Sequence, residues 1–370
     1  MKRIYTDSAA GLQPNPSSLH LEGVKTAEIL KTARQEVAAV VGAHPDEIIF
    51  TSGGTESNNL AIFGAPAGQI LVSAVEHSSV LMPAKVRGNF QIIPVDKEGR
   101  VQLEVLKNLL NKNTALVSVM YVNNELGTVQ PIEEVAKIIR RFRKQHNSHL
   151  PYFHVDACQA TRHFNLDVRK LGVDLLTFNG NKLAGVLGAG VLYVKRGVKL
   201  KPLLYGGGQE AGRRAGTENV PAITRLAEAL TLAQKGREKE SKKLSNLRQY
   251  FIKEVIKHIP AVELNGSLTD SAPYLVNFSF SDLLGEQVVL ELDAKGVAAS
   301  TGSACATHKY DDSYVILALN KSAERARSAV RFSFSPSITK EEVVKIIKIL
   351  KTIINNLRQA NHAYSANLTL

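Results

Sequence analysis

Short apolar runs alternate with helical stretches along the first two thirds of the chain. From Val24 to Val41 apolar residues recur at helical spacing and Gly42 supplies a stop, which predicts a helix before a short strand at 48–50. Six further runs of strand length follow, at 70–75, 91–95, 115–120, 152–155, 174–178 and 190–194. Such alternation is typical of a mainly parallel sheet covered by helices on both faces. We therefore expect a doubly wound α/β unit.

The rhythm changes after a long, charged helix predicted over 221–258. The elements expected beyond it are shorter and more mixed: a strand at 275–280, helices at 285–295 and near 313–319, a strand at 330–334 and a final helix from Thr339. We place a domain change near residue 239. The sequence thus predicts a large domain over 14–238 and a smaller α+β domain made of 1–13 and 239–370.

Composition narrows the functional classes. The 370 residues, 44% of them hydrophobic, suffice for roughly two cores. No stretch approaches the ~18 apolar residues that span a bilayer, and no apolar signal region follows the N-terminus, so a cytoplasmic protein without a membrane partner is expected. The two cysteines, Cys158 and Cys305, imply no disulfide framework. No metal site is predicted.

The charge of +12 comes from 46 basic and 34 acidic residues, and the basic residues are scattered. Their densest cluster, at 140–144, follows a helical pattern and is interpreted as a solvated helix end. Direct nucleic-acid binding is therefore not expected.

Candidate chemistry begins with a lysine and an aspartate. Lys182 closely follows the apolar run at 174–178, and Asp156 ends the run before it. A lysine amine can form a Schiff base with an aldehyde cofactor, and a carboxylate can pair with a pyridinium nitrogen. Either residue alone is weak evidence, because a lysine after a strand is usually a solvated surface charge.

Two further segments suit such a cofactor. Gly54 and Thr55 open a predicted helix, where amide groups and a hydroxyl can bind a phosphate; an ordinary helix start with a threonine N-cap is the alternative. Cys305 lies among small residues at 300–307, a composition typical of a mobile loop. Its thiol is either a nucleophile or an inert small apolar group.

Several motifs in order resemble the cysteine desulfurases, pyridoxal-phosphate (PLP) enzymes of the class V aminotransferase group with fold type I. The resemblance covers almost the whole chain. The segments that carry it are 15–18 with His20, 51–58, 76–77, 123–128, 154–159, 206–210, 213–219 and 300–305.

The resemblance implies a role for each residue of the cofactor site. Lys182 would hold PLP, His77 would stack on its ring and move protons, Asp156 would pair with the ring nitrogen and Gln159 with the phenolic oxygen. The phosphate would lie against Gly54, Thr55, Asn179 and Asn181, and against Thr217 of a neighbouring subunit, which implies a homodimer.

The resemblance also implies a substrate, L-cysteine, oriented by Asn124 and Arg331. The thiolate of Cys305 would take its sulfur as a persulfide and release alanine. The sulfur acceptor would be a protein such as an iron–sulfur scaffold or a tRNA-thiolation protein.

Three departures from the family pattern keep alternatives open. Asn181 and Asn179 stand where histidine and serine are usual, Cys158 replaces a small residue beside Asp156, and the link between residues 10 and 15 is short. The alternatives are a selenocysteine lyase, another class V lyase or aminotransferase, and a scaffold homologue that has lost the cofactor.

Overall fold

The computed structural model describes residues 4–302 and 312–368, with side chains to residue 361; Cys305 lies outside the described residues. Within these ranges seven strands form one sheet in the order β1-β7-β6-β5-β4-β2-β3. Only β7 runs antiparallel to its neighbours, so the mainly parallel sheet is confirmed. The strands are β1 (Ile48–Thr51), β2 (Gln69–Ser73), β3 (Phe90–Ile93), β4 (Thr114–Ser118), β5 (Tyr152–Asp156), β6 (Leu175–Asn179) and β7 (Gly190–Val194).

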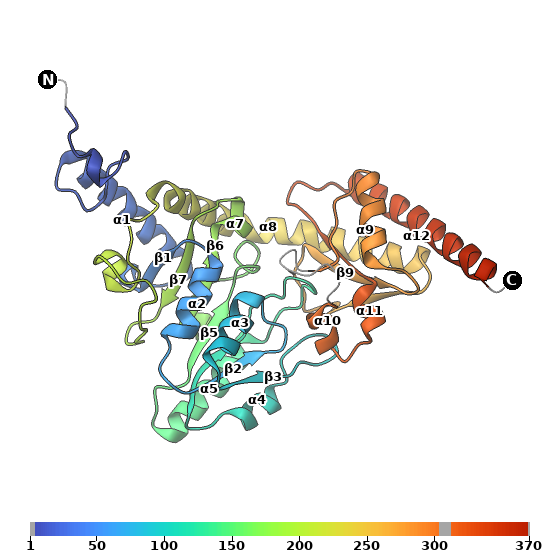
Figure 1. Ribbon diagram of the computed structural model, residues 1–370, viewed down its shortest axis with the longest axis horizontal. Coiled ribbons are helices and arrows are strands. Elements are labelled where there is room, and N and C mark those ends of the chain that lie inside the picture. The colour runs from blue at the N-terminus through green and yellow to red at the C-terminus, as the bar shows by residue number, and fades with distance from the viewer. Residues whose placement is uncertain (1–3, 303–311, 369–370) are drawn as a thin grey trace.

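Helices cover both faces of this sheet because its buried strands are apolar on both sides. Ile70 and Val72 of β2 pack with α2 and α3, whereas Leu71 between them packs with the core that holds α1, α5 and α8. Figure 1 shows α2 and α3 lying over the strands. The helices are α1 (Leu21–Val41), α2 (Gly54–Gly64), α3 (Ser78–Arg87), α4 (Leu103–Leu109), α5 (Ile132–His146), α6 (Val168–Leu171), α7 (Gly180–Ala184) and α8 (Val220–His258).

A second, antiparallel sheet in the order β10-β9-β8 follows in the described part of the chain. It packs with α9 and α12 around a cluster of phenylalanines that includes Phe251, Phe278 and Phe332. The elements of this half are β8 (Val262–Asn265), β9 (Leu275–Phe280), α9 (Gly285–Ala294), α10 (Tyr314–Ala318), α11 (Ala323–Arg327), β10 (Ala329–Ser333) and α12 (Lys340–Leu368).

The long helix α8 runs from one half of the molecule into the other (Figure 1), and its residues belong to both hydrophobic cores. Residues up to Ala233 pack against the first core, and residues from Leu244 onward pack against the second. The predicted boundary near residue 239 falls between these two residues, and the division into domains stays a prediction.

After α8, two elements of the described chain were not predicted, and each has a physical reason. The edge strand β8 is half-exposed at two of its four residues and exposed at a third, Glu263, so it contains no continuous apolar run. Helix α11 has only five residues, too few to show a helical period. The threonine N-cap, given as the alternative for this helix start, is not found: α2 begins after Gly53, and no side chain caps it.

A helix that spans a membrane needs both sufficient length and apolar character. None of the described helices is both long enough and apolar enough to cross a bilayer.

The contact between α9 and β10 gives a testable prediction. A Cβ at Gly285 would stand 2.4 Å from the backbone oxygen of Ala329 in the buried strand β10. Because backbone cannot move aside without breaking the strand, Gly285→Ala should lower the free energy of unfolding by about 1–3 kcal/mol. Chemical denaturation followed by circular dichroism measures this change.

Gly236 offers a matched control in the exposed middle of α8. No atom lies within 4 Å of a Cβ built there, so Gly236→Ala should raise stability by up to about 1 kcal/mol through helix propensity. A gain in stability from both alanine variants would contradict the close packing of α9 on β10.

Candidate active site

Polar residues gather at one edge of the large sheet. Because β2, β4, β5 and β6 run parallel, their carboxyl ends lie at the same edge, where ligands of such sheets bind. Asp156 and Asn179 are the last residues of β5 and β6, while His77 and Asn124 follow β2 and β4. The topology thus brings together residues that are separated by up to about one hundred positions in sequence.

The Asp156 carboxylate is held in place from two sides. It is 5% exposed, its Oδ2 accepts a hydrogen bond from Asn58 Nδ2 at 2.7 Å, and its Oδ1 accepts one from the Cys158 backbone N–H at 2.9 Å. Both oxygens therefore have a donor that fixes the plane of the carboxylate.

Asn58 also links Asp156 to His77. The same Asn58 Nδ2 donates to Ser79 Oγ at 2.8 Å, and Ser79 Oγ lies 2.8 Å from His77 Nδ1. His77 Nδ1 also accepts the Ser79 backbone N–H at 3.1 Å and so caps α3. With Nδ1 used as an acceptor, the proton of the neutral ring is at Nε2.

Lys182 and Asp156 both act on the Cys158 thiol. Burial raises the pKa of Cys158 well above its usual value, the Asp156 carboxylate raises it further, and the Lys182 charge opposes the rise. The Lys182 amine and the Asp156 carboxylate are thus close enough to Cys158 Sγ for both charges to act on its pKa. Since the thiol is held protonated, Cys158 is a packing residue in this arrangement and not a nucleophile.

Asn179 fixes the short helix that carries Lys182. Its Oδ1 accepts the Lys182 backbone N–H at 3.0 Å, which caps α7, and its Nδ2 lies 3.5 Å from Cys158 Sγ. The side chain of Lys182 is exposed. The residue expected to contact a phosphate is therefore first of all a helix cap.

The N-terminus of α2 lies against this group. A Cβ at Gly54 would stand 2.8 Å from Cys158 Sγ and 3.0 Å from Asn179 Nδ2, so no larger residue fits there without movement. In contrast, no atom lies within 4 Å of a Cβ built on Gly53, and Thr55 is exposed. An open helix N-terminus is a place where an anion can bind.

The small sheet meets the large one at Asn124. Arg331 Nη1, from β10, donates to the Asn124 carbonyl at 3.0 Å, and the Arg331 backbone bridges to Ser300. Next to Asn124, the buried Glu125 accepts a hydrogen bond from Ser313 Oγ at 2.6 Å. The two residues expected to orient the substrate are therefore in contact, close to the described ends of the segment that contains Cys305.

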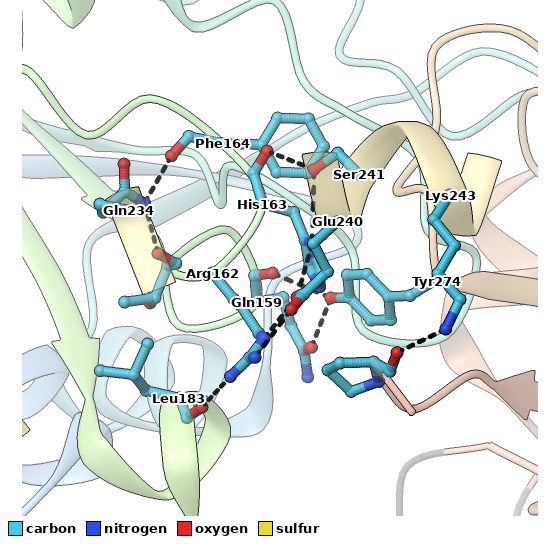
Figure 2. Close-up of polar contacts among 12 residues, drawn as sticks. Gln159, Arg162, His163, Phe164, Leu183, Gln234, Glu240, Ser241, Lys243 and Tyr274 are labelled. Carbon is cyan, nitrogen blue, oxygen red and sulfur yellow. Dashed lines mark hydrogen bonds and ion pairs between the residues drawn. The ribbon is translucent and has the colours of Figure 1, made fainter. Parts of the chain in front are cut away.

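Gln159 lies in the turn after β5, half-buried, and accepts a hydrogen bond from the Tyr274 hydroxyl (Figure 2). Thr217 and Asn181 are exposed, and no described contact fixes either side chain. Their expected contacts with a phosphate stay predictions.

Comparisons with known proteins decide the family. The family model described as "Aminotransferase class-V" matches residues 1–346. The cysteine desulfurase IscS of Dictyoglomus turgidum is 43% identical over 354 residues, which is 93% of this chain and 88% of the relative. The chain belongs to the cysteine desulfurase family.

Solved structures agree with this membership. A NifS-like protein superposes with a TM-score of 0.84 at 32% identity, covering 92% of this chain and 91% of that one. A structure described as SspA in complex with cysteine gives a TM-score of 0.73 at 31% identity, covering 88% and 92%. The chain is thus an enzyme of the cysteine desulfurase family, a family that generally uses PLP.

Sequence reasoning assigned no role to Asn58, Ser79 or Tyr274. Asn58 carries a signal in retrospect, because it lies one helical turn after Gly54 and is a polar residue on the buried face of α2. Ser79 is only two residues from His77, but its other partner, Asn58, is 21 residues away. Tyr274 carries no local signal, since Gln159 is 115 residues away.

Two buried ionisable residues, His154 and Glu76, lie near enough to Asp156 for its charge to act on their pKa values. His154 lies between Ser118 and Thr177, and burial lowers its pKa to about 4 against the opposing charge of Asp156. Glu76 Oε1 accepts hydrogen bonds from Ser73 Oγ and the Met120 N–H. Burial, with a smaller contribution from the Asp156 charge, raises the pKa of Glu76 to about 8.

Glu76 should make stability depend on pH. Its pKa is 4.5 in an unfolded chain and about 8 in the fold, so between these values the folded state binds more protons. The contribution of Glu76 to the free energy of unfolding is fully present below pH 4.5 and is lost as the pH rises through 8. Glu76→Gln removes this titration, so urea denaturation should show that the stability of the variant relative to wild type is higher at pH 8.5 than at pH 5.5 by a few kcal/mol.

Glu291→Gln, at an exposed position of α9, is the control and should follow the wild type at both pH values. An equal stability difference between Glu76→Gln and wild type at pH 5.5 and 8.5 would contradict the raised pKa of Glu76.

Proposed function

We propose that this protein is a PLP-dependent cysteine desulfurase, which converts L-cysteine to L-alanine and passes the sulfur to a cysteine of its own chain. The observation that supports this most strongly is the chain of contacts between Lys182 and Asp156 at the carboxyl edge of the sheet. Asn179 caps the helix of Lys182 and lies 3.5 Å from Cys158 Sγ, and the Cys158 N–H donates to Asp156. That arrangement occurs in a chain 43% identical to an IscS cysteine desulfurase.

The described residues fit PLP. A buried carboxylate faces the site from β5, an exposed amine stands on α7, and an open helix N-terminus lies beside both. When bound, PLP supplies an aldehyde for a lysine and a ring that accepts electrons from the substrate α-carbon. Asn179, whose presence suggested loss of the cofactor, caps the helix of Lys182 and so supports the binding site.

Each side chain has a distinct task in this proposal. Asp156, oriented by Asn58 and the Cys158 N–H, pairs with the ring nitrogen. His77 is anchored through Nδ1, so its Nε2 is the atom that moves a proton. Lys182, whose side chain is exposed, would hold the cofactor through its aldehyde.

Substrate recognition is assigned to Asn124 and Arg331. The guanidinium fork of Arg331 suits the carboxylate of L-cysteine, and its contact with Asn124 brings the small sheet to the site. Cys305, in the segment between Gly302 and Asp312, is proposed to receive the sulfur as a persulfide. The sulfur then passes to an acceptor such as an iron–sulfur scaffold or a tRNA-thiolation protein.

A homodimer belongs to the same proposal. Large apolar side chains are exposed along the N-terminal segment and in the loop after β7, with Leu12, Leu19 and Tyr205 exposed by 95%, 96% and 80%. Apolar surface of this kind is usually covered by a partner. A second copy that covers it could bring Thr217 to the phosphate of the neighbouring site.

Two cysteine variants test this function. Purified wild type with PLP should absorb visible light and release alanine and sulfide from L-cysteine. Cys305→Ala should keep the visible absorption but lose sulfide release, because the cofactor site is intact and the sulfur has no receiving thiol. Absorption spectra and a sulfide assay under a thiol reductant measure both properties.

Cys158→Ala is the matched control, since it removes the other thiol of the chain. Mass spectrometry of the cysteine-treated variant should still find the added sulfur on Cys305. Persulfide found on Cys158 in the wild type, or sulfide release by Cys305→Ala at the wild-type rate, would contradict the proposed route.

A further inference from the structure

Tyr274, just before β9, makes two contacts with the cofactor-side residue Gln159. Its hydroxyl oxygen lies 2.8 Å from the Gln159 backbone oxygen and 2.8 Å from Gln159 Oε1. Figure 2 shows the Tyr274 ring and the Gln159 side chain pointing toward one another. A residue of the small half of the molecule thus reaches the turn that follows Asp156.

The position of the Tyr274 ring is well defined. It packs against both hydrophobic cores and lies against the His163 ring with a centroid distance of 4.8 Å. Its backbone carbonyl accepts the Phe334 N–H at 2.7 Å. The hydroxyl is therefore presented from a fixed point and not from a rotating surface side chain.

The turn that carries Gln159 is also fixed. Arg162 donates to both carboxylate oxygens of Glu240 on α8, at 2.5 and 2.8 Å, and to the Leu183 carbonyl at 3.0 Å (Figure 2). Leu183 is the neighbour of Lys182 on α7. With the backbone held on both sides, the main freedom left to Gln159 is the rotation of its side-chain amide.

That rotation decides what Gln159 can do to a ligand. A glutamine amide accepts at Oε1 and donates only at Nε2. Because Oε1 faces the Tyr274 hydroxyl, Nε2 is directed elsewhere and can donate to an anionic oxygen. Burial raises the pKa of Tyr274, opposed by the Arg331 charge, so the hydroxyl keeps its proton and remains a donor at neutral pH.

We propose that Tyr274 is a positioning residue, whose hydroxyl orients the Gln159 amide so that Nε2 donates to the phenolic oxygen of PLP. This inference rests on the proposed function, since it requires PLP at this site. Without the hydroxyl, the amide can turn its Oε1 toward the phenolic oxygen, where two acceptors repel.

Tyr274→Phe keeps the ring and its packing and removes only the hydroxyl. The apoprotein of this variant should bind PLP roughly 3- to 10-fold more weakly, the effect of one neutral hydrogen bond. The pH at which the visible absorption of the PLP-bound protein changes should rise by roughly 0.5–1 unit, because a donor to the phenolic oxygen favours the form without the proton. Tyr250→Phe, on α8 in the second core, is the control and should change neither value.

A double-mutant cycle separates positioning from packing. If Tyr274 acts through Gln159, Tyr274→Phe should add no further loss of PLP affinity and no further pH shift in a Gln159→Ala background. Equal effects in both backgrounds, or wild-type values for Tyr274→Phe alone, would overturn the inference while PLP binding by the wild type upholds the proposed function. Failure of the wild-type apoprotein to bind PLP would overturn both.

Discussion

The site depends on the fixed orientation of one buried carboxylate. Asp156 is the last residue of the central strand β5. Its carboxylate accepts one hydrogen bond from Asn58 on helix α2 and one from the Cys158 N–H in the turn after β5. A buried carboxylate without such donors would be costly. Asn58 extends this control to His77 through Ser79, so the residue proposed to pair with the ring nitrogen and the residue proposed to move a proton are positioned together.

The second constraint is the junction between the two sheets. Arg331 reaches Asn124 and Tyr274 reaches Gln159, so the residues proposed to contact substrate and cofactor each have a partner from the small half of the molecule. Helix α8 supports this junction because it belongs to both cores and supplies Glu240 to Arg162. The relative position of the sheets therefore bears directly on the chemistry.

The sequence predicted the parallel sheet well, because strands buried on both faces must be continuous apolar runs. The strand pattern also placed Asp156 at the carboxyl end of a strand, where the structure has it at the end of β5. The contacts made by Asn58 and Tyr274 were beyond it: their partners lie 98 and 115 residues away, and a local pattern carries no trace of such a pairing. Strand β8 is largely exposed, so it has no apolar run by which it could be predicted. The roles given to the site residues, Asn181, Thr217 and Cys305 among them, remain predictions.

The central claim is that the exposed amine of Lys182, on the helix capped by Asn179, holds the cofactor beside Asp156. Borohydride reduction of the PLP-bound protein, followed by peptide mass spectrometry, tests it most directly. The account predicts a single stable pyridoxyl label on Lys182 and none in a Lys182→Ala variant treated in the same way. A label on another lysine, or unchanged labelling of the variant, would contradict it.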